Sequence, residues 1–225
     1  MVLNTWSRSE HPRAVLAQCE VAIEHYRGIL ALVSQKLGLP AESLARNLFE
    51  LSICTIYLAK HPELLDDFID FGTNIHYEVL AAMSPALLAR DKSLLNELEM
   101  REFEHDRMVA YFGKKSWHRR SVRELADDTG FGPLYRTFYK VSSSIAHGDS
   151  FILLRRRHLR WWTSEVNRKR WASYVETSAR FAYLLMATLF EQVNLVLALG
   201  HDQPMHEMET YIATHPEYEI PTDLR

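Results

Sequence analysis

Apolar side chains at steps of three and four residues run through this sequence and restrict what it can fold into. Only eight glycines and eight prolines interrupt its 225 residues, which leaves few turns for a chain of many short strands. The pattern predicts an all-α fold, a single-domain helical bundle of about six to seven helices. The expected helices span residues 12–37, 41–60, 62–83, 92–112, 132–148 and 169–199, with Gly38 ending the first. The apolar positions that the helical period assigns to the core include Leu16, Leu30, Ile75, Val79 and Val141.

One domain of this length can bury a substantial core, which we place at about residues 12–200, with residues 201–225 as a C-terminal tail helix. The first residues contain no apolar run typical of a signal peptide. The most membrane-like stretch, residues 179–199, carries Arg180 and Glu191, which are costly in lipid. Cys19 and Cys54 lie in apolar helical patterns without metal-ligand spacing. We therefore expect a cytoplasmic protein with reduced cysteines and no membrane contact.

Charge is distributed unevenly along the chain. Residues 114–170 carry a net charge of +9, whereas residues 1–113 and 171–225 carry −6 each. This basic, irregular insertion interleaves cations such as Arg155, Arg156 and Arg157 with aromatic rings such as Trp117. Dispersed cations attract phosphates and exposed rings stack on bases, so the block is a candidate surface for single-stranded nucleic acid or a nucleotide. The alternative is that its arginines pair with the acidic flanking segments.

The predicted helix at residues 132–148 carries the candidate site. One face is apolar, and the other aligns Arg136, Tyr139, Lys140, Ser143 and His147 at steps of three and four. His147 with Ser143 one turn earlier has the chemistry of a general acid or base toward a phosphodiester, with Arg136 steadying the phosphate. The alternative is a histidine that caps the helix end.

A second polar feature lies in the predicted helix at residues 41–60, which is otherwise nearly all apolar after Ala45. Arg46 and Glu50 are one turn apart there, where opposite charges pair. A charge in such a helix needs a partner or a role in a site. The sequence leaves open a structural ion pair and a functional carboxylate.

Other enzyme templates are missing from the sequence. It contains no phosphate-binding glycine loop, no paired cysteine motif, no zinc-protease HExxH and no nucleophile elbow. His201 and His206 lie in an expected turn with Asp202 nearby, and we give a metal there little weight. We therefore predict neither a cofactor nor a metal.

Ten residues carry a resemblance to a known family. They are Trp117, Ser121, Val122, Tyr135, Tyr139, Ser143, His147 and Gly148, with Arg46 and Glu50 upstream. Their spacing resembles the signature of a bacterial, all-helical family of unknown function, over roughly residues 15–200. The resemblance implies a helical fold and a shared polar pocket formed by Arg46, Glu50, Tyr139, Ser143 and His147. It implies no reaction.

The outline is also similar to the HEPN class of helical proteins, many of which are RNA-cleaving toxins or defence factors. That class uses an arginine five to seven residues before a histidine, and none of the eleven histidines here has one. Two hypotheses follow: a non-catalytic binding module with the polar pocket, and a metal-independent, HEPN-like ribonuclease that uses His147. Either fits a homodimer, because Trp161 and Trp162 need cover.

Overall fold

The computed structural model describes residues 10–83, 117–146 and 165–201, together with positions 90, 93–96, 98 and 203. Within these residues all regular elements are helical, which confirms the all-α prediction. The chain forms two compact units: Met1–His11 with His61–Ser121, and Pro12–Lys60 with Val122–Arg225. We call them unit 1 and unit 2. The predicted domain boundaries stay a prediction, and the tail helix falls almost wholly outside the described residues.

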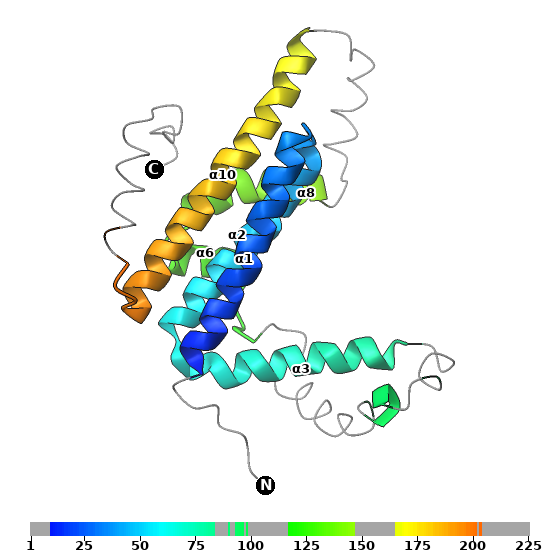
Figure 1. The fold of residues 1–225 in the computed structure, drawn as a ribbon, viewed down its shortest axis with the longest axis vertical. Helices are drawn as coiled ribbons and strands as arrows, with labels where there is room; N and C mark the ends of the chain where they lie inside the picture. Colours follow the sequence, from blue (N-terminus) through cyan, green and yellow to red (C-terminus); the bar gives the residue numbers. More distant parts are fainter. Residues whose placement is uncertain are drawn as a thin grey trace. The chain divides into compact units, whose positions relative to one another are not determined.

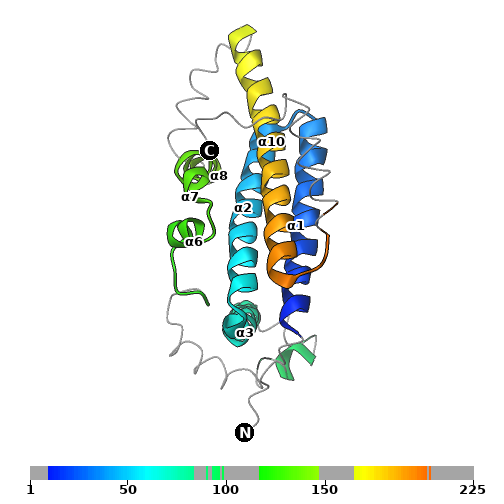
Figure 2. The same ribbon diagram turned by 90° about the vertical axis from the view of Figure 1, so that its left-hand side faces the viewer.

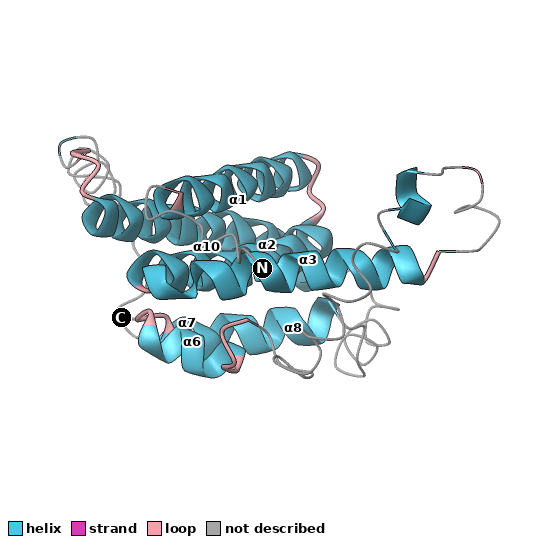
Figure 3. Cartoon of the chain, turned by 90° about the horizontal axis from the view of Figure 1, so that it is seen from below, coloured by secondary structure: helices cyan, strands magenta, loops and turns pink. Residues whose placement is uncertain are grey.

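Unit 2 contains most of the described helices. They are α1 (His11–Ser34, of which His11 belongs to unit 1), α2 (Gly38–Lys60), α6 (Val122–Asp128), α7 (Gly132–Leu134), η2 (Tyr135–Tyr139), α8 (Lys140–Ala146) and α10 (Glu165–Leu197). Helix α2 packs against α10 and also against α6 and α8. Figure 1 shows α2 running alongside α10, and Figure 2 shows α2 between the α6–α8 segment and α10. Seen from below, α1 and the α6–α8 segment lie on opposite sides of α2 and α10 (Figure 3).

The core of unit 2 forms along α2 because this helix is apolar on nearly every side. Phe49 is fully buried, and its ring meets Phe131 at 5.9 Å, Tyr139 at 5.2 Å and Phe181 at 6.3 Å between centroids. These partners come from the loop before α7, from η2 and from α10. Phe49 therefore joins the layers on both sides of α2.

Helix α1 buries a narrower stripe than its sequence predicts. Val15, Cys19 and Ala22 are buried, as expected, but Leu16 and Leu30 are 40% and 41% exposed. The apolar positions of α1 therefore span more of its circumference than the core of unit 2 covers. The expectation that Leu16 and Leu30 belong to the core is wrong.

The ends of two helices in unit 2 also differ from the prediction. We expected Gly38 to end the first helix, but Lys36 turns the chain in the left-handed region (φ 59°), with Leu37 N–H donating to Leu32 O. Gly38 instead opens α2, where an added Cβ would meet Tyr174 Cβ of α10 at 3.0 Å. At the end of α10, Ala198 (φ 51°) has the same role as Lys36. Both turns place a non-glycine residue where glycine is favoured.

Replacing Ala198 with glycine is expected to raise the free energy of unfolding by about 1 kcal/mol, because glycine adopts positive φ without steric cost. Urea denaturation followed by circular dichroism measures the change. The matched opposite change is Gly130→Ala, at φ 87° with open space around it, which is expected to cost a similar amount. A destabilised Ala198→Gly variant would contradict the assignment of this turn.

Unit 1 contains η1 (Pro62–Leu64) and α3 (Leu65–Ala81). The predicted helix over residues 62–83 therefore begins with a 3₁₀ turn at Pro62. Leu65 and Leu80 of α3 are buried, but Ile75 and Val79, which we placed in the core, are exposed.

Both cysteines are free thiols, as predicted. Burial raises the pKa of Cys19 to about 11, and burial with the charge of Glu50 raises the pKa of Cys54 to about 12. Both groups therefore stay protonated near neutral pH. Across the described ranges, every helix is too short or too polar to cross a membrane.

Candidate functional site

A row of charged residues runs along the side of α2 that faces η2 and α8. Glu42, Arg46 and Glu50 follow one another at four-residue steps, so they share one face of the helix. Opposite them stand Tyr139 at the end of η2 and Ser142 in α8. We call these five residues the polar seam. It lies entirely within unit 2.

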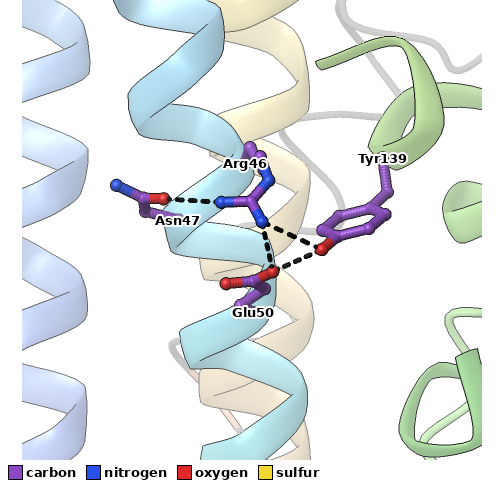
Figure 4. Close-up of polar contacts among 4 residues, drawn as sticks. All are labelled: Arg46, Asn47, Glu50 and Tyr139. Carbon is purple, nitrogen blue, oxygen red and sulfur yellow. Dashed lines mark hydrogen bonds and ion pairs between the residues drawn. The ribbon is translucent and has the colours of Figure 1, made fainter. Parts of the chain in front are cut away.

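Three residues of the polar seam form one hydrogen-bonded network (Figure 4). Arg46 Nη2 donates to Glu50 Oε1 at 2.8 Å and to the Tyr139 hydroxyl at 3.2 Å. The Tyr139 hydroxyl in turn donates to the same Glu50 oxygen. Arg46 Nη1 donates to Asn47 Oδ1 at 3.2 Å. The guanidinium carbon also lies 5.3 Å from the centroid of the Tyr139 ring, within the range of a cation–π contact.

The π-helical turn η2 places Tyr139 in this network. A π turn adds one residue to the helix and rotates everything after it. The buried positions are therefore Tyr139, Ser142 and Ile145, whereas Val141, which we placed on the apolar face, is 37% exposed. The helical period predicts Tyr139 on the polar face of this helix, and the family resemblance implies a pocket that it shares with Arg46 and Glu50. The extra residue turns Tyr139 toward α2.

A second contact of the polar seam was missed from the sequence. The Ser142 hydroxyl donates to Glu42 Oε1 at 3.3 Å, and both residues are buried. The four-residue spacing of Glu42, Arg46 and Glu50 is the sequence feature that could have placed Glu42 in the polar seam. Ser142 lies three residues after Tyr139 and shares its face, but one hydroxyl among three consecutive serines predicts no particular contact.

Burial is the main cause of the altered acidity of Tyr139. It raises the pKa from the ordinary value of 10.0 to about 12, and the hydrogen bond to Glu50 and its charge act in the same direction, against Arg46. Since the folded-state pKa lies above the unfolded one, the stability contributed by the protonated phenol is complete below about pH 10. It is lost as the pH rises through about 12.

This arrangement favours a structural role for the network over a chemical one. Arg46 is 16% exposed and its charge is balanced by Glu50. Tyr139 stays protonated and donates its hydrogen, so it is a poor nucleophile at neutral pH. The sequence left open an ion pair and a functional carboxylate at Glu50, and the expected ion pair is present.

The other predicted site residues that the structure describes lie outside the polar seam. Ser143 is half-buried in α8, beside the buried Ser142. Arg136 is exposed and pairs with Asp127 at 3.6 Å. His147, Arg155, Arg156 and Arg157 lie outside the described residues.

Trp117 is 5% exposed and packs edge-on against Phe68 of α3, with ring centroids 5.2 Å apart. A base has no access to a ring that is covered in this way. We therefore correct the expectation that Trp117 belongs to an exposed stacking surface and assign it to the core of unit 1.

The described residues hold no group of three or more histidine, cysteine or acidic side chains able to bind a metal ion. What they define is an all-α protein whose central helix is joined to a π-turn helix by the polar seam. A model described as a family of unknown function (DUF5677) matches residues 14–163, and the chain belongs to this family. The match includes Arg46, Glu50 and Tyr139. No curated protein and no solved structure matches the chain.

Proposed function

We propose that the protein is a non-catalytic helical module that binds single-stranded nucleic acid through the basic block of residues 114–170. The observation that carries the proposal is the charge of this block, +9 between two segments of −6. Phosphate backbones are bound by dispersed cations, and such binding needs no base-specific contact.

The charges of the polar seam favour a ligand site elsewhere on the protein. The charge of Arg46 is already balanced by Glu50, so a phosphate gains little from approaching the network. An anionic ligand has to find its cations elsewhere. Within the described part of the block, Arg119 and Arg120 are exposed.

In this proposal the network has a positioning role. It fixes the end of η2 against α2, and α8 continues directly from η2. Arg46, Glu50 and Tyr139 are thus expected to influence binding through the placement of α8, without contacting the ligand.

The test is fluorescence anisotropy of labelled single-stranded RNA with the full chain, in excess EDTA and at several salt concentrations. An Arg155/Arg156/Arg157→Gln variant is expected to bind on the order of tenfold more weakly. Its slope of log K against log salt should fall by about 2, because three phosphate contacts are lost. The matched control is Arg180→Gln, which lies outside the block and pairs with Glu176 at 2.6 Å.

RNA binding that is insensitive to salt, or equally weak in both variants, would contradict the proposal.

The same mixture of protein and labelled RNA also tests the ribonuclease alternative. Cleavage that persists in EDTA and disappears in His147→Ala would replace the binding module with a HEPN-like nuclease.

A further inference from the structure

Helix α1 presents an apolar stripe that the core of unit 2 does not use. Leu16, Ile23 and Leu30 are seven residues apart, so they recur every two turns along one flank of the helix. Leu16 and Leu30 are 40% and 41% exposed, and Ile23 is half-buried. We call these three residues the α1 stripe. Figure 3 shows α1 as the outermost described helix of unit 2 on the side away from α6 and α8.

Charged residues border the α1 stripe in a self-complementary pattern. Glu20 lies three residues before Ile23 and Arg27 four residues after it, and both are exposed. On a helical wheel the two charges lie within about 20° of each other, beside the apolar residues. If a second copy of the helix runs in the opposite direction and the two copies cross at Ile23, the glutamate of each copy lies opposite the arginine of the other.

We infer that two copies of this chain associate through the α1 stripe, with their α1 helices antiparallel about a two-fold axis near Ile23. Leu16 of one copy then meets Leu30 of the other, and Ile23 meets its own counterpart. Glu20 faces the partner's Arg27 twice, once on each side of the axis. In a parallel pair the flanks that carry Glu20 and Arg27 would lie on opposite sides of the interface, so neither charge would meet its opposite on the partner. The charges thus select the antiparallel arrangement.

The experiment is sedimentation equilibrium of the full chain and of charge-reversed variants. The wild type is expected to be a dimer, and Glu20→Arg and Arg27→Glu are each expected to raise the dimer Kd about tenfold or more, because two attractive pairs become repulsive. An equimolar mixture of the two single variants should form a heterodimer, since all four charges are then paired correctly. The double variant Glu20→Arg/Arg27→Glu should restore the homodimer.

A matched pair of substitutions separates the α1 stripe from general effects on α1. Leu30→Glu is expected to weaken the dimer, whereas Val21→Glu, on another side of the helix at the same 41% exposure, should leave it unchanged. Circular dichroism establishes that each variant keeps its helical content and melting temperature. A monomeric wild type, or a dimer that ignores both charge reversals and Leu30→Glu, would overturn the inference.

Discussion

Replacing Phe49 with alanine is expected to lower the free energy of unfolding by about 3–5 kcal/mol. Phe49 is fully buried in α2, and its ring contacts Phe131, Tyr139 and Phe181 from three other segments of unit 2. The truncation removes the buried ring and leaves a cavity where these segments meet, and that cavity closes only in part. Urea denaturation followed by far-ultraviolet circular dichroism measures the loss.

Leu195→Ala is the control for this change, because Leu195 is apolar, lies in α10 and is 72% exposed. Truncation at the surface is expected to change the unfolding free energy by no more than about 0.5 kcal/mol. If Phe49→Ala costs less than about 1 kcal/mol, Phe49 does not join the two sides of α2 as described.

Replacing Glu50 with glutamine is expected to cost about 2 kcal/mol. The substitution keeps the size of the side chain but removes the charge that balances Arg46, which is 16% exposed. It also weakens the acceptor of the Tyr139 hydroxyl. Breaking a fully buried ion pair costs more, about 3–5 kcal/mol, and the 33% exposure of Glu50 reduces that cost through solvent screening.

Glu63→Gln is the control for the Glu50 substitution. Glu63 pairs with His61 at 2.9 Å but is 65% exposed, so its loss is expected to change the unfolding free energy by no more than about 0.5 kcal/mol. Equal costs for the two substitutions would show that Glu50 forms an ordinary surface pair. A larger cost for Glu50→Gln supports the polar seam.

The helical fold and part of the polar seam could be predicted from the sequence for simple physical reasons. A repeat of 3.6 residues is local, so the helices of unit 2 are visible without tertiary information. The pairing of Arg46 with Glu50 is equally local, because side chains four residues apart meet on a helix.

Other features depend on contacts between distant segments. The π turn at η2 places Tyr139 against α2, and no single-residue propensity predicts such a turn. Lys36 and Ala198 adopt positive φ although glycine is nearby in the sequence, because helix packing determines where each helix has to end. Leu16 and Leu30 match the helical period of α1. Packing against the rest of unit 2 decides how much of the surface of α1 is covered, and it leaves these two residues exposed.

In this chain Arg46, Glu50 and Tyr139 join α2 to η2. Hydrogen bonds between side chains of two helices favour the register in which they form. The bonds that join Arg46, Glu50 and Tyr139 therefore favour one register of η2 against α2, although Arg46 Nε is buried without a hydrogen-bond partner. The basic block of residues 114–170 includes α6, α7, η2 and α8.

The most direct test of this account is a double-mutant cycle between Glu50 and Tyr139, using Glu50→Gln, Tyr139→Phe and the double variant. We predict a coupling free energy of about 1–2 kcal/mol, because each substitution alone disrupts a network that the other residue shares. The unfolding free energies of the four proteins, measured in urea at neutral pH, give this value. A coupling near zero would contradict the claim that these residues form one network between α2 and η2.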